Sequence, residues 1–411
     1  MVEWKIVEIK DICTGIYEGP HATPKESLTG GIYLGIPAIS NDGHINFEVA
    51  KRISEEDLPF WTKRVTPQED DIVFTNEATL NLYAIIPRGF HGCLGRRLGL
   101  IRLNKSLVNV RYLFYYFFSP EWRETISRNK VFGATVERIL MTKFPHFPVK
   151  LPPLSVQNRI ANILSALDDK IALNNRINHN LEEQAQVLFK SYFVDFEPFK
   201  HGQFIDSELG KIPRDWKTIR FKSLAEIQKN TLNPQKSPQS LFTLYSLPAY
   251  DNNKEPETLC GEDILSNKTI IDGKLVLVSK LNPRIKRIWP ISVTANNTLC
   301  STEFIAYKAV EENLHPFVWC YLNSESYYER IMSEVNGATG SHQRFHAEKT
   351  MEYLIPYNHI AASVFSQNVS PILESIIKNE QENRVLKAKR DLLLPKLLLG
   401  KLEYSDLISY L

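Results

Sequence analysis

The sequence predicts an α+β protein in which two similar globular domains are joined by two long helices. Three observations predict this: the chain repeats itself, each repeat mixes strands with helices, and each repeat closes with a heptad pattern. Similar halves in one chain favour a pseudo-two-fold internal repeat, so we expect the helices to form an antiparallel coiled coil. The 411 residues, 43% of them hydrophobic, are enough for a core in each domain.

The repeat is visible in short segments at matching places. "EWKIVEIKDI" at 3–12 is similar to "DWKTIRFKSL" at 215–224, and "GAT" at 133–135 returns at 337–339. An aromatic-rich helical segment precedes each "GAT", and a strand containing proline follows it. The segments "DDIVFTN", "LGLIRL", "GKLVLVSK" and "STEFIAYK" read as further strands.

Five parts of the chain are therefore expected. They are a first domain at 1–150, a first long coiled-coil helix at 151–194, a linker at 195–213, a second domain at 214–357, and a second long coiled-coil helix with a C-terminal tail at 358–411. Proline lacks a backbone N–H, so Pro395 is expected to end or kink the second helix.

Two asparagines interrupt each heptad seam in matching layers. They are Asn174 and Asn178 in the first helix and Asn379 and Asn383 in the second. A buried asparagine weakens a coiled coil but penalises registers that leave its amide unpaired. We therefore expect these four residues to set the register. In the alternative interpretation, each helix packs on its own domain and the amides are solvated.

Composition favours a soluble, cytoplasmic protein. The formal net charge is +2, and the five cysteines include no C-x-x-C pair, which favours a reducing compartment. The first ten residues lack the apolar core of a signal peptide. The apolar run "YLFYYFF" is far shorter than the roughly 20 residues that span a bilayer, so no membrane partner is expected.

Catalytic motifs are missing from the sequence. It has no G-x-G turn, no G-K-[ST], no [ND]-P-P-[YF] and no Pro-Asp pair. The segment "HQRFH" has Gln343 where a zinc protease has glutamate, and no third ligand is evident, so no metal site is expected. The adjacent Asp168 and Asp169 are expected on a solvated helix face. No catalytic residue is therefore assigned.

Two local clusters carry basic residues and no acid. "AIIPRGFHGCLGRRLGLIR" at 84–102 has four arginines, and "KLVLVSKLNPRIKRIW" at 274–289 has five basic residues. We interpret them as corresponding regions of the two halves. Arginine binds guanine bidentately in the major groove, and any cation neutralises phosphate. The alternative is an ordinary basic surface.

A further candidate is "GATGSHQRF" at 337–345, because small residues let the backbone approach a ligand and its polar residues suit base edges. Its partner is "GATVERI"; the alternative for both is a glycine-led helix entry with surface polar residues. The candidate DNA-binding residues are Asn76, Glu77, Arg88, Arg96, Arg97, Thr135 and Arg138 in the first half, and Lys280, Asn282, Arg284, Lys286, Arg287, Ser341, His342, Gln343 and Arg344 in the second.

Four segments make the chain resemble the specificity subunit of a type I restriction-modification system. They are "LPPLSVQNRIANILSALDDKIALNNRINHNLEEQAQVLFKSYFVDFEPF", "SKLNPRIKRIW", "GATGSHQR" and "RDLLLPKLLLGKLEY". The resemblance covers essentially the whole chain, and the first of these segments is the most specific.

This resemblance implies two target-recognition domains, each reading one half of a split double-stranded DNA site, with the helices setting their separation. It implies no catalytic activity and no cofactor in this chain. The partners would be two modification subunits that bind S-adenosylmethionine and, in the full complex, two ATP-driven restriction subunits. S-adenosylmethionine, ATP and Mg²⁺ are accordingly expected on the partner subunits.

Two other functions stay open from the residues alone. A single-chain DNA methyltransferase or nuclease with a fused recognition domain would bind S-adenosylmethionine tightly without partners. A coiled-coil adaptor with no DNA role would show no salt-sensitive DNA binding in its assembled complex. The missing motifs count against the first, and the two basic clusters count against the second.

Overall fold

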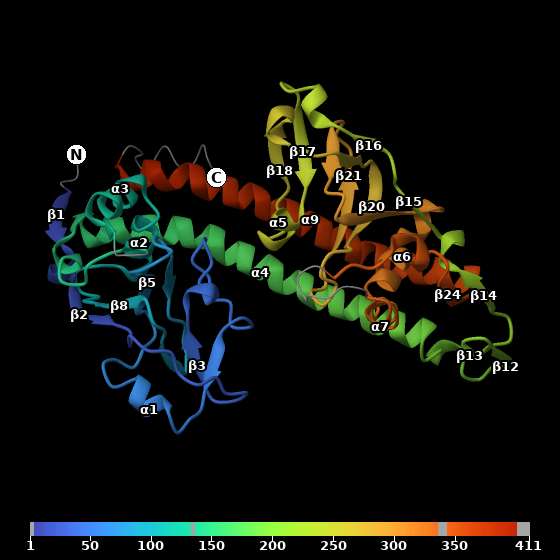
Figure 1. The fold of residues 1–411 in the computed structure, drawn as a ribbon, viewed down its shortest axis with the longest axis horizontal. Helices are drawn as coiled ribbons and strands as arrows, with labels where there is room; N and C mark the ends of the chain where they lie inside the picture. Colours follow the sequence, from blue (N-terminus) through green and yellow to red (C-terminus); the bar gives the residue numbers. More distant parts are fainter. Residues whose placement is uncertain (1–3, 133–135, 336–342, 401–411) are drawn as a thin grey trace. The chain divides into compact units, whose positions relative to one another are not determined.

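The structure is a computed structural model that describes residues 4–132, 136–335 and 343–400. The chain divides into two compact units, and each unit includes part of both long helices (Figure 1). Unit 1 consists of residues 1–169 and 386–411, and unit 2 of residues 170–385. Each unit has its own large hydrophobic core.

Unit 1 contains short strands arranged mainly in two sheets. The strands are β1 (Lys5–Glu8), β2 (Cys13–Glu18), β3 (Gly31–Leu34), β4 (Lys51–Ile53), β5 (Ile72–Thr75), β6 (Tyr83–Ile85), β7 (Gly92–Leu94), β8 (Leu98–Leu103), β9 (Val131–Phe132), β10 (Glu137–Arg138) and β11 (Pro148–Leu151). One sheet is antiparallel in the order β2-β8-β5-β6, and the other has the order β4-β3-β7 with β3 and β7 parallel. β1 pairs with β11, which closes the domain just before the first long helix.

Short helices cover the core of unit 1. They are α1 (Leu58–Trp61), α2 (Val110–Tyr116) and α3 (Pro120–Asn129), with 3-10 turns at Ile9–Ile12, Ile36–Ala38 and Phe144–His146. Ser119 caps α3, because its hydroxyl accepts the N–H of Trp122 at 3.1 Å. The buried Trp122 indole in turn donates to the Tyr83 hydroxyl at 2.8 Å, which ties α3 to β6. The cap and this aromatic contact together fix the helix on the sheet.

Unit 2 contains a second set of strands. They are β12 (Phe204–Ser207), β13 (Gly210–Pro213), β14 (Lys217–Arg220), β15 (Ala225–Ile227), β16 (Thr231–Leu232), β17 (Leu241–Tyr245), β18 (Glu257–Cys260), β19 (Lys268–Ile270), β20 (Gly273–Ser279), β21 (Ile288–Val293), β22 (Thr298–Cys300), β23 (Phe304–Ala309) and β24 (Leu354–Tyr357). Its helices are α5 (Leu247–Asp251), α6 (His315–Leu322), α7 (Glu325–Ser333) and α8 (Ala347–Thr350), and its 3-10 turns are Glu197–Phe199, Phe221–Ser223, Pro234–Lys236, Gly261–Asp263 and Glu312–Leu314.

Unit 2 repeats the topology of unit 1. The sheet β15-β23-β20-β21 has the strand order of β2-β8-β5-β6, and the run β18-β17-β22 repeats β4-β3-β7, including the parallel pair. β14 pairs with β24 as β1 pairs with β11. Unit 2 adds β16 and β19 to its second sheet and a hairpin, β12–β13, within the segment expected as a linker. The predicted α+β fold with two similar domains is confirmed.

The two long helices, α4 (Leu154–Phe193) and α9 (His359–Leu398), are each 40 residues long and pack against each other in antiparallel directions. In unit 2 the Asn174 amide donates to Asn383 Oδ1 at 2.9 Å, and the Asn379 amide donates to Asn178 Oδ1 at 2.7 Å. The structure therefore brings the four asparagines together in two layers, each containing one residue from either helix. A slip of either helix would separate these amides from their partners.

Two expectations about the helices are wrong in part. Pro395 does not end the second helix, because α9 continues through it to Leu398, and burial of the leucines around the proline, including Leu397, offsets the lost hydrogen bond. Asp168 does not lie on a solvated face: its side chain is 16% exposed and pairs with Arg390 at 2.8 Å. Tyr115 of α2 also donates to Asp168, at 2.6 Å, so this carboxylate joins the first domain to both helices of unit 1.

One buried histidine makes unit 2 sensitive to acid. His315, at the start of α6, is buried, and neither ring nitrogen has a hydrogen-bond partner among the described residues. Burial, helped by the nearby Lys274 charge, lowers its pKa to about 4. The fold therefore favours the neutral ring. Its contribution to the free energy of unfolding is present above about pH 6.5 and is lost as the pH falls toward 4.

We expect His315→Leu to remove this acid sensitivity. Between pH 7.5 and 4.5 the wild-type chain should lose about 2–3 kcal/mol more free energy of unfolding than the variant. Urea unfolding at both pH values measures the difference. His201→Leu, which replaces an exposed histidine of the same unit, is the control and should behave as wild type. Equal pH dependence in His315→Leu and wild type would contradict the prediction.

Candidate nucleic-acid interface

In unit 1, three segments meet at the edge of the main sheet where β5 ends. The N–H of Asn76 donates to the carbonyl of Arg97 at 3.1 Å, so the loop after β5 lies beside the turn before β8. A β-bridge then joins Glu77 to Arg138. We call this set of residues the first loop junction; it comprises residues 76–78, 96–97 and 137–139.

In unit 2, the equivalent segments meet in the same way. The N–H of Lys280 donates to the carbonyl of Glu303 at 2.9 Å, and a β-bridge joins Leu281 to Arg344. We call this set the second loop junction; it comprises residues 280–282, 303 and 343–345. Arg138 and Arg344 thus occupy equivalent backbone positions in the two units.

The two junctions also share a backbone conformation. Ala78 has φ +70° and Asn282 has φ +48°, both in the left-handed region. The N–H of Ala78 donates to the carbonyl of Glu137 at 2.9 Å, and that of Asn282 donates to the carbonyl of Gln343 at 2.8 Å. Left-handed non-glycine residues are uncommon and concentrate at functional sites. Two unlike sequences therefore build the same strained turn at the same place.

The first junction exposes arginine side chains. Arg96 and Arg138 are exposed, and neither forms an ion pair with any residue that the structure describes. Arg97 lies 3.0 Å from the carboxylate of Glu77, which neutralises part of its charge. Exposed, unpaired guanidinium groups are available to phosphate oxygens or base edges.

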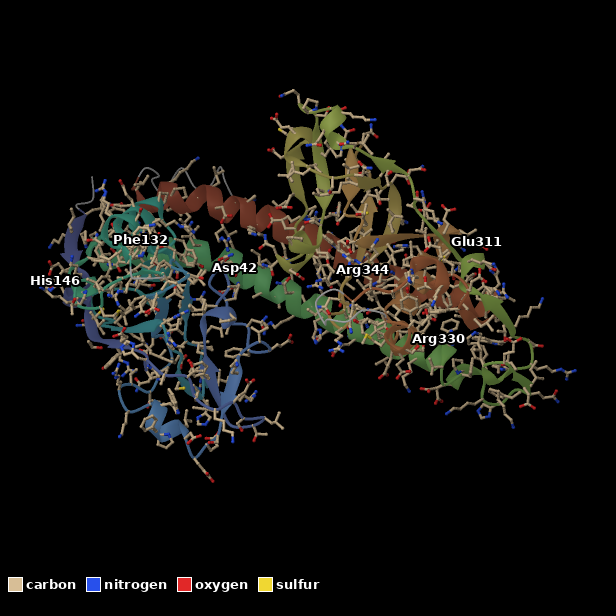
Figure 2. The ribbon with its side chains drawn as sticks, in the orientation of Figure 1. Asp42, Phe132, His146, Glu311, Arg330 and Arg344 are labelled. Atoms are coloured by element: carbon tan, nitrogen blue, oxygen red, sulfur yellow. The ribbon has the colours of Figure 1, made fainter. Side chains whose placement is uncertain are left out.

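In the second junction, an acidic residue takes the turn position that an arginine occupies in the first. Arg344, labelled in Figure 2, makes two contacts with Glu303, at 3.1 and 3.2 Å. The acid therefore lies on the turn before β23, where unit 1 has Arg97 on the turn before β8. Arg284, in the loop between β20 and β21, is exposed, and no ion pair of it occurs within the described part of the chain. Lys280 is half-buried beside it in that loop.

Each junction holds a buried amide oxygen without a partner. Asn76 donates its amide to Glu18 at 3.0 Å, but its Oδ1 accepts no hydrogen bond from the residues described. The Oε1 of Gln343 is likewise buried and unbonded within that part of the chain. Buried acceptors of this kind normally have a partner, so both atoms are positioned to accept a bond from a ligand or water.

Three candidate residues lie elsewhere or have other contacts. Arg287 forms a bidentate pair with Asp251 at 2.7 and 2.8 Å. The Lys286 ammonium donates to the carbonyl of Asn323, and burial lowers its pKa. Arg88 follows β6, which runs antiparallel to β5. It therefore lies near the start of β5, whereas Asn76 lies at the end of that strand. Three further candidates lie outside the described residues: Thr135, Ser341 and His342.

The expected correspondence between the two basic clusters is wrong. The cluster at 84–102 runs from β6 through β7 to β8, whereas the cluster at 274–289 covers β20, its following loop and the start of β21. By strand order, the equivalent of the second cluster is the β5–β6 hairpin. Composition locates basic residues along the chain, but only strand pairing decides which loops share one edge of a sheet.

Phe132 is a candidate that the sequence analysis missed. It lies on β9 opposite Glu137, is 79% exposed, and is labelled in Figure 2. The Lys130 ammonium lies 5.9 Å from its ring centroid. An exposed aromatic beside Arg138 suits stacking on a base or sugar. The signal in the sequence was an aromatic residue directly before the first "GAT".

Within residues 4–132, 136–335 and 343–400, no helix has the length and low charge needed to cross a membrane. The same ranges hold no group of three or more His, Cys, Asp or Glu side chains placed to bind a metal ion. Of the two histidines in "HQRFH", His342 lies outside the described residues and His346 is exposed before α8.

Two topologically equivalent α+β domains on one pair of long helices define a duplicated architecture with matching loop junctions. Residues 1–183 match the family described as Type I restriction modification DNA specificity domain. The MjaIX specificity subunit of Methanocaldococcus jannaschii is 26% identical over 98% of this chain and 95% of its own length. The HindI specificity subunit of Haemophilus influenzae is 22% identical over 98% of this chain and 100% of its own.

A solved structure has the same fold. The type I restriction-modification S subunit from M. genitalium superposes with a TM-score of 0.55 at 15% identity, covering 96% of each chain. Over nearly its whole length the chain is therefore similar to specificity subunits of type I restriction-modification systems. Specificity subunits are non-catalytic components that bind DNA and the other subunits, and cofactor use lies with the modification and restriction subunits.

Proposed function

We propose that each domain reads one half of a split DNA target through its loop junction, and that α4 and α9 set the separation of the half-sites. The observation that carries this proposal is the duplicated junction. The same backbone hydrogen bonds place Arg138 in one unit and Arg344 in the other at equivalent positions. A protein that reads two half-sites needs such a site twice.

The side chains divide by role in this proposal. Arg96, Arg97 and Arg138 contact the first half-site, with Asn76 and Glu77 supporting the turn that holds them. Arg344, Gln343, Arg284 and Lys280 contact the second, with Asn282 forming its turn. Arg88, Lys286 and Arg287 have a smaller role, because the first lies at the opposite end of β5 from Asn76 and the other two have contacts within their own domain. Thr135, Ser341 and His342 remain candidates from their residue types.

The proposed complex contains two modification subunits, which bind S-adenosylmethionine, and in its full form two restriction subunits that use ATP and Mg²⁺. We place the recognition domains at 1–150 and 214–357, the first long helix at 151–194, the linker at 195–213, and the second long helix with a C-terminal tail at 358–411. The bounds of α4 and α9 support this division. We place the complex in the cytoplasm, and the five free cysteines are compatible with a reducing compartment.

The purified chain alone is expected neither to methylate nor to cleave DNA, because it lacks cofactor and catalytic motifs. Together with its modification subunit it should transfer labelled methyl groups to DNA. Single-molecule sequencing of that DNA should then reveal a motif of two short blocks separated by an unread gap. Turnover by the chain alone, or a continuous motif, would contradict the proposed function.

A further inference from the structure

A lysine of the second domain enters the pair of long helices. The Lys254 ammonium lies 3.0 Å from Glu380 of α9 and 3.4 Å from Glu182 of α4. The side chain of Lys254 is 22% exposed and that of Glu380 only 10%. We call Lys254, Glu182 and Glu380 the docking triad. It joins one domain to both helices through a single side chain, and all three residues belong to unit 2.

The backbone around Lys254 is shaped to present it. Asn253 has φ +59° and Lys254 has φ +55°, so two consecutive non-glycine residues adopt the left-handed conformation one residue beyond the end of α5. The N–H of Lys254 donates to the carbonyl of Tyr250 at 3.0 Å, which holds this turn on the end of the helix. Such a conformation persists only where the surrounding contacts determine it. The ion pairs of the docking triad are contacts of that kind.

The docking triad is connected to the loop that carries the second cluster of basic residues. Arg287, at the end of the β20–β21 loop, forms its bidentate pair with Asp251 of α5, three residues before Lys254. The indole N–H of Trp289, on β21, donates to the second carboxylate oxygen of Glu380 at 3.3 Å. Two sets of side-chain contacts therefore connect β21 and its preceding loop to α9. One passes through α5 and the other through Trp289.

Charged contacts of this kind specify position more than they add stability. The triad places two carboxylates and one ammonium in a poorly solvated site, where desolvation opposes much of the attraction. An apolar contact would tolerate sliding, whereas a partly buried ammonium must keep its distance to both carboxylates. Removing Lys254 alone would leave two unpaired acids close together.

The first domain is attached to the helices by different residues. In unit 1 the contact runs through α2, where Tyr115 donates to Asp168 and Arg111 pairs with Asp169 at 3.1 Å. Arg390 of α9 completes that contact with Asp168. The docking triad is therefore specific to the second domain and does not follow from the topology that the two domains share.

We propose that the docking triad fixes the orientation of the second recognition domain on the helix pair, and thereby determines how strictly the gap between half-sites is discriminated. This inference rests on the proposed function. One base pair changes the position of a half-site by about 3.4 Å along the DNA and by about a tenth of a turn. A domain held by a directional ion-pair triad resists such a displacement, and a domain released from it accommodates neighbouring gaps.

The test uses the complex of the full chain with its modification subunit. The probe is a plasmid library that carries the two half-sites of the wild-type motif with gaps from two base pairs shorter to two longer. The variant Lys254→Met, Glu182→Gln, Glu380→Gln removes all three charges together, so no unpaired acid remains. Lys254→Arg keeps the positive charge. Lys229→Met is the matched control, because Lys229 pairs with Glu348 on the exposed surface of the same unit.

The wild-type complex should methylate a site with a wrong gap at least about 100-fold more slowly than the native site, since a displaced half-site loses several contacts. The triple variant should reduce that difference to about tenfold or less, with both half-site sequences unchanged. Lys254→Arg and Lys229→Met should keep the wild-type preference.

An assembled triple variant with the wild-type gap preference would overturn the inference, as would a variant whose half-site sequences change together with the gap. If the triple variant does not assemble, Glu182→Gln replaces it; a partial broadening supports the inference, and an unchanged preference overturns it. A wild-type motif without a gap would instead contradict the proposed function.

Discussion

Four residues inserted into each long helix, after Ala172 in α4 and after Val385 in α9, are expected to lengthen the gap in the DNA target by one or two base pairs. Each insertion adds about one helical turn, or about 6 Å. A base pair occupies about 3.4 Å of the duplex. The register set by Asn174 and Asn383 places Val385 opposite Ala172, so the paired insertions keep both asparagine layers intact.

An insertion in α4 alone tests the register as well as the length. It moves Asp168 by about one turn relative to Arg390 unless the asparagine layers separate instead. We therefore expect the single insertion to lower the midpoint of thermal unfolding more than the paired insertion does. Methylome sequencing of both variants measures the gap, and the half-site sequences should stay constant. An active paired variant with the original gap would show that the helices do not set the separation.

Loss of one junction arginine is expected to weaken recognition of one half-site only. Arg344→Ala should reduce specific binding by about 1–3 kcal/mol, and Arg138→Ala should do the same for the other half-site. Both residues are exposed at equivalent bridges of their loop junctions. The double variant Arg96→Ala, Arg97→Ala should weaken binding to the first half-site further, because loss of Arg97 also leaves the Glu77 carboxylate unpaired near the DNA.

Titration of the assembled complex against duplexes with one altered half-site separates the two effects at a fixed salt concentration. Arg128→Ala and Arg220→Ala are the controls, because these arginines lie on α3 and β14 and pair with Glu124 and Glu352. Arg284→Ala should make the slope of log affinity against log salt concentration shallower, by the amount expected for the loss of about one phosphate contact. Wild-type affinity in Arg138→Ala and Arg344→Ala together would show that the loop junctions do not contact DNA.

Much of the fold could be predicted because it is encoded locally. The strand segments "LGLIRL" and "GKLVLVSK" became β8 and β20, since their apolar residues fill the centre of each main sheet. The repeated "GAT" segments and their neighbouring helices identified two similar domains. The heptad spacing and its asparagines indicated a helix pair in one register, because that pattern is unfavourable in any other arrangement.

The candidate site could be predicted only in part. Residue types identified Arg138 and Arg344 beside the "GAT" segments, but the pairing of Arg344 with Glu303 joins residues far apart in sequence. Asp168 and Arg390 are also far apart in sequence. Because they pair, Asp168 does not lie on the solvated helix face that the sequence had predicted. Ion pairs leave no periodicity in the chain, so a sequence does not reveal which charge a given arginine meets.

The sequence by itself determined the duplication, the α+β class, the two long helices and their asparagine layers, because each follows from a repeated or periodic pattern of residues. Only the tertiary structure decided which loops lie together at one edge of each sheet. It also decided that Lys254 lies between α4 and α9. Strand order and helix packing set those neighbours, and both depend on contacts between residues that are distant along the chain.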